Sequence, residues 1–297
     1  MSALEELQET IERVAGAVGP SIVGLGRGWG RGSGVVIAPG KVLTSAHNLR
    51  RDEVYLMFAD GRRETASIAA SDADADLAVL SVETGDAPTI DWADAEARLG
   101  MPVLALANPG ARGLRVTFGL VSSTGRSFRG ARGRRVTDTL EHTAPLPRGS
   151  SGGPVVDTAG RLLGVNTLRL EGGLIVAVAG TAAMRERVGA LGRGESPQRR
   201  TLGIYVAPPR AARRMRRAVG LPERDGALVR GVAEGSPAGR AGIERGDLIV
   251  AVGGKQIGRL DDLYEAVDSA QGADLELGLV RGTEQRTVRV ELETSGG

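Results

Sequence analysis

The 297-residue sequence contains no cysteine and only two histidines, His47 and His142. The absence of cysteine excludes disulfides, thiolate nucleophiles and cysteine-ligated zinc, and two histidines are too few for the usual histidine-rich metal sites. We therefore expect neither a metal nor a cofactor.

Aromatic residues make up only 3% of the chain. A hydrophobic core must then be built mainly from Val, Leu, Ile and Ala, while 45 glycines allow many tight turns. The 41% hydrophobic and 25% charged residues are typical of a globular protein, and the length fits two domains of about 150 residues. This composition excludes fibrous and wholly disordered chains.

Long hydrophobic runs are absent as well, since no stretch reaches the roughly 18 consecutive apolar residues of a membrane span. The first residues, MSALEEL, are acidic, whereas a signal peptide starts with basic and then apolar residues. We expect a cytoplasmic chain without a membrane span.

Residues 1–20 are predicted to contain an amphipathic helix, because apolar residues recur at spacings of three and four with glutamates between them. The apolar positions are Leu4, Leu7, Ile11, Val14 and Val18. Such a stripe either packs on the helix's own domain, which we prefer, or contacts another subunit.

Residues 21–185 consist of short apolar runs, such as SGVVIAPG and DLAVLSV, separated by Gly, Pro, Asn and Asp. Runs of this length predict an all-β barrel or sandwich, and no strand–helix alternation is visible. Residues 186–200 mix Gly, Ser, Pro and charge without periodicity and are predicted to be a linker. Residues 201–295 combine strand-like runs with a helical segment near LDDLYEAVDSA and are predicted to form a small α+β domain.

Three segments carry chemistry: TSAH at 44–47, DLAVL at 76–80 and GSSGGP at 149–154. A serine hydroxyl is a poor nucleophile unless an imidazole takes its proton, and the imidazole needs a carboxylate to hold its tautomer. Glycines beside Ser151 allow the chain to aim backbone N–H groups at a developing oxyanion, and the natural donors are Gly149 and Ser151.

Two choices within this set remain open from the residues alone. Asp72, Asp74 and Asp76 alternate and would share one face of a strand. Asp76 is preferred to Asp74 because the apolar run begins directly after it. His142 is interpreted as a structural or pocket-lining residue, because one general base suffices.

These segments, together with GSG at 32–34 and LLGVNT at 162–167, resemble the chymotrypsin-like double β-barrel proteases. They are most similar to the HtrA/Deg branch, in which a C-terminal PDZ domain follows the barrels, and residues 228–257 resemble the PDZ pattern of that branch. The resemblance covers about residues 22–292. It implies a mainly β fold, with a chymotrypsin-like double six-stranded β-barrel followed by a small α+β PDZ domain.

The resemblance implies that His47 is the general base, Asp76 its orienting carboxylate and Ser151 the nucleophile, with the amides of Gly149 and Ser151 as the oxyanion hole. Three segments depart from the sequence motifs that are usual in this family. The chain has TSAHN for T-N-x-H-V, GSSGGP for G-N-S-G-G-P, and HTAPLPR for T-D-A-A-I-N-P. No triad member is lost, and we expect the change across 142–148 to affect loop ordering and substrate choice.

The resemblance also places Pro145 at the floor of the primary substrate pocket, where the sequence offers no carboxylate to pair with Lys or Arg. The expected walls are Leu163, Val165 and Val176. We therefore predict cleavage after small or medium apolar residues such as Ala, Val or Leu.

In the second domain, Thr201-Leu202-Gly203-Ile204 resembles the carboxylate-binding loop of PDZ domains. PDZ domains bind a peptide's C-terminus by strand addition. Residues expected to line the pocket for an apolar C-terminal side chain are Leu202, Gly203, Ile204, Leu263, Ala266 and Val267. The alternative is a PDZ domain that serves only as a regulatory lid or spacer.

Two further motifs have simpler explanations. The segment GRGWGRGSG at 26–34 lacks the Gly-Lys-Ser/Thr ending of a phosphate-binding loop and is predicted to be a strand and turn. The arginine cluster within residues 210–217 could contact nucleic acid or an acidic partner. A formal net charge of only +2 and the lack of interleaved aromatics favour a solvated helical insertion of the PDZ domain, so we expect no nucleic-acid partner.

The sequence therefore predicts an ATP-independent serine endopeptidase that cleaves unfolded or exposed polypeptides through an acyl-enzyme, with the PDZ domain selecting or gating substrate. Protein quality control is the implied role, and related proteases suggest a homotrimer. The competing hypothesis is a protease-like scaffold or chaperone that binds polypeptide termini without efficient cleavage.

Overall fold

The computed structural model describes residues 2–26, 32–49, 53–129, 135–197, 199–207, 209–270 and 274–295. The chain forms two compact units, one within residues 2–196 and the other almost entirely within residues 197–295. Within the described residues, no helix is long and apolar enough to cross a membrane. In the same ranges no three His, Asp or Glu side chains gather as metal ligands.

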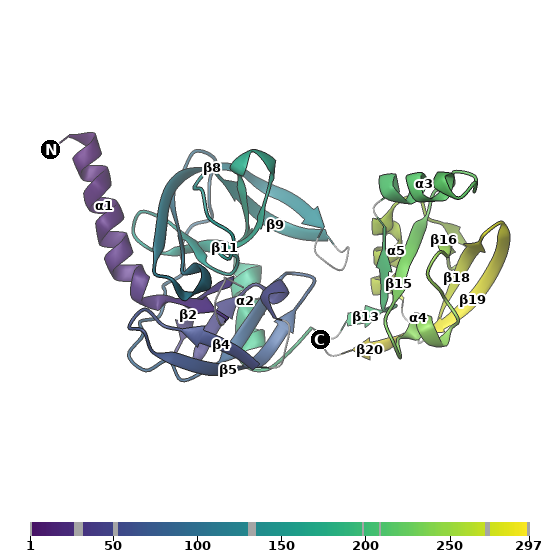
Figure 1. The fold of residues 1–297 in the computed structure, drawn as a ribbon, viewed down its shortest axis with the longest axis horizontal. Coiled ribbons are helices and arrows are strands. Elements are labelled where there is room, and N and C mark those ends of the chain that lie inside the picture. Colours follow the sequence, from purple (N-terminus) through teal and green to yellow (C-terminus); the bar gives the residue numbers. More distant parts are fainter. Residues whose placement is uncertain are drawn as a thin grey trace. The chain divides into compact units, whose positions relative to one another are not determined.

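The first unit begins with helix α1, Ala3–Val18, whose start is capped by Ser2. The Ser2 hydroxyl accepts from Glu5 N–H, while the Glu5 carboxylate accepts from Ser2 N–H. Only the C-terminal half of the helix is anchored: Val14 is fully buried, whereas Leu4 is 78% exposed. Figure 1 accordingly shows the first turns of α1 projecting from the barrels.

The first barrel consists of six short antiparallel strands that close on themselves in the order β1-β2-β3-β6-β5-β4. Their bounds are β1 Ile22–Leu25, β2 Gly32–Ala38, β3 Lys41–Thr44, β4 Glu53–Met57, β5 Arg63–Asp72 and β6 Leu77–Ser81. Residues 27–31 of the glycine-rich segment lie outside the described residues. Closure leaves no sheet edge, so every strand has a partner on both sides.

The second barrel has the same number of strands in the order β10-β11-β12-β9-β8-β7. Their bounds are β7 Pro102–Ala107, β8 Arg115–Arg129, β9 Arg135–His142, β10 Pro154–Val156, β11 Leu162–Arg169 and β12 Ile175–Ala179. The two closed six-stranded barrels confirm the fold class predicted from the sequence.

One apolar core cluster joins α1, both barrels and the helix that follows them. Its fully buried members include Val14, Leu43, Leu104, Leu162 and Leu191. Burying one leucine side chain contributes about 1.5–3 kcal/mol. The shared cluster therefore makes the two barrels one folding unit.

Helix α2, Ala182–Gly192, occupies the first part of the segment predicted to be a linker. Its N-cap is Thr181, and Met184, Val188 and Leu191 are buried on one face. The sequence did not reveal this helix, because Gly189 and Gly192 have low helix propensity and lie among its apolar residues. The linker prediction for 186–200 is therefore corrected: residues up to Gly192 are helical.

The second unit is a small α+β domain, as the sequence predicted. Its main sheet has the order β14-β15-β16-β18-β19, with β17 paired to β16, and β13 pairs with β20 in a separate two-stranded sheet. The strands are β13 Arg199–Thr201, β14 Ile204–Val206, β15 Ala227–Val232, β16 Leu248–Val252, β17 Lys255–Gln256, β18 Asp274–Arg281, β19 Glu284–Glu291 and β20 Glu293–Ser295. The helices are α3 Pro209–Ala218, α4 Pro237–Arg240 and α5 Leu260–Ser269.

The arginine-rich segment is a helix, α3, but it is not solvated throughout. Arg216 is only 2% exposed and donates to Pro222 O at 3.1 Å, and burial lowers the pKa of its guanidinium. Arg213 and Arg217 are exposed and pair with Asp225 and Glu223. The prediction of a solvated insertion is thus corrected for Arg216.

We expect Leu191→Ala to lower the free energy of unfolding by about 2–5 kcal/mol, because it leaves a cavity under α2. The matched control is Leu99→Ala, since Leu99 is 75% exposed, and its change is expected to stay within about 0.5 kcal/mol. Denaturant unfolding of the full chain measures both. Equal effects of the two substitutions would show that α2 is not packed in the core.

Candidate active site

The imidazole of His47 and the carboxylate of Asp76 form an assembled pair. His47 lies in the 3₁₀ turn Ala46–Asn48, directly after β3, and Asp76 lies directly before β6. Because β3 and β6 are paired antiparallel neighbours, both residues lie at the same end of the first barrel. His47 Nδ1 lies 2.9 Å from each carboxylate oxygen, and His47 N–H donates to Asp76 Oδ1 at 3.0 Å.

This geometry sets the tautomer of the histidine. Asp76 is 6% exposed, while the His47 side chain is 40% exposed. An ionised carboxylate only accepts hydrogen bonds, so Nδ1 carries the proton and Nε2 is left to accept one. His47 is therefore set up as a general base.

The backbone of Asp76 adopts φ 56°, in the left-handed region that non-glycine residues rarely occupy. Ala46 N–H donates to Asp76 O at 3.2 Å, which helps to hold this conformation. Asp72 turns elsewhere: it accepts from Asp74 N–H and pairs with Arg187 at 3.0 Å. The structure thus places Asp76, rather than Asp72 or Asp74, against the imidazole.

Thr167, near the end of β11, is a site residue that the sequence reasoning did not single out. Its hydroxyl donates to Asp76 Oδ2, and its carbonyl accepts from the Ser151 hydroxyl at 2.9 Å. The only signal was its place at the end of LLGVNT, since its contacts are with residues far away in sequence. Thr167 therefore links the carboxylate in the first barrel to the nucleophile in the second.

The Ser151 hydroxyl occupies a resting position. Within the described residues its one hydrogen bond goes to Thr167 O, and none joins it to His47 Nε2. Side-chain hydroxyls reorient by rotation between staggered rotamers. Nucleophilic attack thus requires the Ser151 side chain to turn from Thr167 towards His47.

The loop that carries Ser151 is anchored through its carbonyl groups. Ser151 O accepts from Ser33 N–H at 2.8 Å, and Gly149 O accepts from the Ser33 hydroxyl at 3.1 Å. No hydrogen bond among the described residues uses the N–H groups of Gly149 or Ser151. The oxyanion hole expected at these two amides stays a prediction, and neither amide is occupied by another acceptor among the described residues.

Gly152, directly after the nucleophile, has φ 90°, and a Cβ there would lie 2.1 Å from Ser33 O and 2.3 Å from Thr44 Oγ1. Both the backbone conformation and the lack of space require glycine. Its N–H donates to Asn166 O at 2.7 Å, which ties the loop to β11.

His142 is fully buried at the end of β9, with Nε2 2.8 Å from Asn166 Oδ1. The Asn166 amide nitrogen donates to Gly153 O and Pro154 O, so Oδ1 accepts and the proton lies on His142 Nε2. Burial lowers the pKa of His142, and Nδ1 has no partner among the described residues. His142 is a neutral residue that supports the strand beside the nucleophile loop.

Two family descriptions match the chain: "Trypsin-like peptidase domain" over residues 32–165 and "PDZ domain" over residues 228–281. The "Serine protease HTRA2, mitochondrial" of Drosophila pseudoobscura pseudoobscura is 32% identical over 283 residues, covering 88% of this chain and 66% of that protein. The chain belongs to the HtrA-type serine proteases. It thus spans slightly less than two thirds of that relative's length.

Two solved protease structures agree with the fold of this HtrA-type chain. The serine endoprotease from Yersinia pestis matches with a TM-score of 0.59 at 26% sequence identity. The match covers 96% of this chain and 98% of the Yersinia pestis chain. A structure titled "HtrA-type protease AlgW with tripeptide" has a TM-score of 0.56 at 26% identity, with coverages of 95% and 96%. Both comparisons extend over the barrels and the PDZ domain.

The residues predicted to line the primary pocket of this HtrA-type protease do not all lie together. Pro145 is exposed between the buried Ala144 and Leu146. Leu163 and Val165 belong to the packed barrel core, because β11 is buried on both faces up to Thr167. This differs from the prediction that they form the walls of the substrate pocket.

Val176 is 6% exposed and pairs with Leu168, one residue after Thr167 in β11. Leu168 is 39% exposed and was not singled out from the sequence. The residues of β11 that are accessible beside the nucleophile are therefore those after Thr167.

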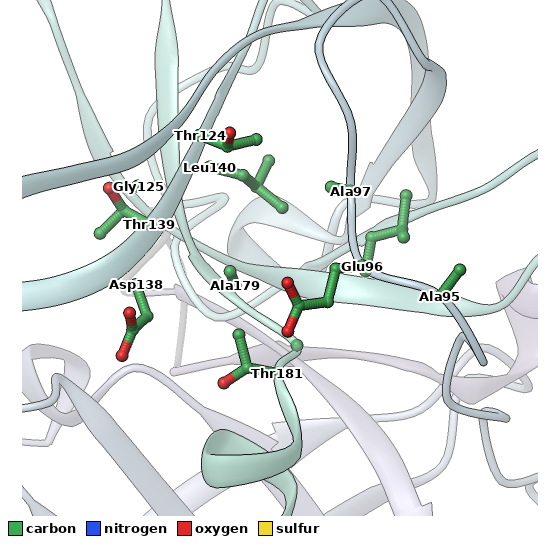
Figure 2. Close-up of a pocket in the computed structure, with 12 residues that line it drawn as sticks. Ala95, Glu96, Ala97, Thr124, Gly125, Asp138, Thr139, Leu140, Ala179 and Thr181 are labelled. Atoms are coloured by element: carbon green, nitrogen blue, oxygen red, sulfur yellow. The ribbon is translucent and has the colours of Figure 1, made fainter.

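Leu163 lines a different cavity of about 220 Å³. Leu140 and Ala179 contribute apolar lining, and the carboxylates of Glu96 and Asp138 border it (Figure 2). No triad residue lines this cavity, so it is separate from the catalytic centre.

The PDZ residues predicted from the sequence lie close together. Leu202, Ile204, Leu263 and Val267 belong to one core cluster, with Leu263 fully buried and Val267 2% exposed. Gly203 has φ 69°, and a Cβ there would lie 2.3 Å from Ser236 Cβ. Strand β14 pairs only with β15 in the described sheet, so it forms a sheet edge that a peptide strand can extend.

The burial of neutral His142 gives a stability prediction. The pKa of His142 lies below 6.5 in the folded state and at about 6.5 in the unfolded state. Unfolding in mildly acidic solution therefore takes up a proton at His142. The free energy of unfolding is therefore expected to fall as the pH drops below about 6.5, and to be level above it.

His142→Gln keeps an N–H for Asn166 but cannot titrate, so it is expected to lose part of this pH dependence. Denaturant unfolding of both proteins at about pH 5 and about pH 8 measures the difference. If wild type and variant lose the same free energy on acidification, His142 is not the group responsible.

Proposed function

We propose that this chain is an ATP-independent serine endopeptidase that cleaves unfolded or exposed polypeptides. The observation that carries the proposal is the contact of His47 Nδ1 with Asp76 at 2.9 Å beside a serine whose loop leaves two backbone amides free. Membership of the HtrA-type family supports the same activity.

Catalysis starts when the Ser151 side chain turns from Thr167 O to His47 Nε2. The Ser151 oxygen attacks the peptide carbonyl carbon while its proton passes to Nε2, and Asp76 stabilises the imidazolium. The carbonyl oxygen becomes an oxyanion that accepts from the N–H groups of Gly149 and Ser151. Each such donor is worth about 2.7–4 kcal/mol of transition-state stabilisation.

The tetrahedral intermediate then collapses as the carbon–nitrogen bond breaks. The imidazolium of His47 gives its proton to the leaving amine, and an acyl-Ser151 ester remains. A water molecule gives a proton to His47 and attacks the ester, and the proton returns to Ser151 as the second product leaves. No step consumes a nucleotide, which accounts for the ATP independence.

The substrate residue before the cleaved bond is proposed to be small or medium and apolar. Pro145 offers no charge, and its neighbours Ala144 and Leu146 are apolar and buried. Val176 lies on the strand next to β11 and adds a further apolar side chain. A pocket of this kind would leave the charge of a Lys or Arg side chain unpaired.

The PDZ domain is proposed to select or gate substrates by binding peptide C-termini at the edge of β14. The solved AlgW structure with a tripeptide supports peptide binding within this family. The alternative, a lid or spacer, would not need the open sheet edge of β14. The homotrimer and the cytoplasmic location stay predictions of the sequence.

A scaffold or chaperone without efficient cleavage is not favoured, because the chain matches a trypsin-like peptidase domain and its relatives are serine proteases. We expect Ser151→Ala to reduce cleavage of unfolded casein by at least about 1000-fold, since it removes the nucleophile. The matched control is Ser123→Ala in β8, outside the site. Equal casein cleavage by wild type and Ser151→Ala would disprove the proposed mechanism.

A peptide panel that varies only the residue before the cleaved bond tests the proposed pocket. Peptides with Ala, Val or Leu are expected to have kcat/KM values at least about 10-fold above those with Lys or Arg. Fastest cleavage after Arg would refute the apolar pocket while leaving the triad untouched.

A further inference from the structure

Asn48 follows the general base directly in sequence and is only 7% exposed. The HtrA pattern has a valine at this position, so this chain carries a buried amide where the family carries an apolar side chain. A buried amide needs hydrogen-bond partners, because leaving it unsatisfied costs free energy. The identity of those partners indicates what Asn48 does.

The partners of Asn48 lie on the nucleophile loop and on β3. Its Nδ2 donates to Ser151 O at 2.9 Å and to Thr44 Oγ1 at 3.1 Å. Ser151 O also accepts from Ser33 N–H at 2.8 Å, so both lone pairs of this carbonyl are used. The backbone of the nucleophile is thus held by two donors, both from the first barrel.

The space around Asn48 is fitted to its amide. A Cβ on Gly32 would lie 2.3 Å from Asn48 Nδ2 and 2.4 Å from Asn48 Cγ, so the side chain fills room that a glycine leaves open. Thr44 Oγ1 accepts from Asn48 and donates to Ser33 O at 2.7 Å. Asn48, Thr44 and Ser33 therefore form one network that ends on Ser151 O.

We propose that Asn48 is a positioning residue: with Ser33 N–H, it fixes the Ser151 backbone so that only the side chain turns between Thr167 O and His47 Nε2. This proposal rests on the proposed endopeptidase function. A backbone held in place limits the motion of the reacting oxygen to rotation of the Ser151 side chain, and misplacement of a reacting group by about 1 Å costs up to about 100-fold in rate.

The test replaces the amide by a group of similar shape that cannot donate. Asn48→Leu is close in shape to asparagine, and Asn48→Val introduces the residue of the family pattern, so at least one of the two is expected to fold. Both variants lose the hydrogen bonds to Ser151 O and Thr44 Oγ1, and loss of the neutral bond to Ser151 O predicts a fall in kcat of about 3- to 10-fold. We expect KM on an apolar peptide to change by less than about 2-fold, because Asn48 binds the enzyme's own backbone rather than the substrate.

Two further readouts separate positioning from a loss of general stability. The rate of fluorophosphonate labelling of Ser151 is expected to fall by the same factor as kcat, with an unchanged pH profile. Hydrogen exchange at Gly152 and Gly153, whose amides hold the nucleophile loop in place, is expected to become faster. The matched control is Thr84→Val, which removes a buried side-chain acceptor of Gly40 N–H away from the site.

Unchanged kcat and unchanged exchange in both Asn48 variants would overturn the proposal, as would equal losses in Thr84→Val. The exchange measurement needs no turnover. It therefore tests the role of Asn48 even where the wild-type chain cleaves nothing, a result that would count against the endopeptidase function alone.

Discussion

The contact between His47 and Asp76 depends on one pairing of strands in the first barrel, and the rest of the site is arranged around it. Because β3 and β6 run antiparallel side by side, the turn after one and the turn before the other meet. The second barrel then supplies Ser151 and Thr167. Thr167 contacts both the Asp76 carboxylate and the Ser151 hydroxyl. The position of β11 therefore determines whether the nucleophile lies near the His47–Asp76 pair.

The nucleophile loop separates two tasks of its backbone. Its carbonyl oxygens, those of Gly149 and Ser151, face the first barrel and accept from Ser33 and Asn48. The amides of the same two residues stay unused among the described groups. Because the loop is anchored through its carbonyl oxygens, its backbone N–H groups stay unused. Such N–H groups can stabilise the negative charge of an oxyanion without a movement of the loop.

The sequence predicted the barrels and the triad because both are encoded locally. Short apolar runs alternate with turn residues, and the chemistry of Ser151, His47 and Asp76 can be recognised from residue type and order. The contacts of Thr167 and Asn48 were not predictable, since they join residues 91 and 103 positions apart.

Burial on both faces of a strand was equally invisible in the sequence. Leu163 and Val165 are apolar in either location, whether they face a pocket or the core, so only packing assigns them to the core. Helix α2 was missed for a different reason, because two glycines masked its apolar stripe. The local sequence therefore predicted the catalytic residues better than it predicted the residues that line the substrate pocket.

Gly152 limits how such an enzyme can be altered over evolutionary time. Any side chain after the nucleophile would collide with Ser33 O, so this position cannot change while the fold persists. Pro145 and Arg148, a few residues before Ser151, are different, because their side chains are exposed to solvent. Substitutions that alter specificity can therefore occur at these exposed positions before the reactive serine, but not at the residue directly after it.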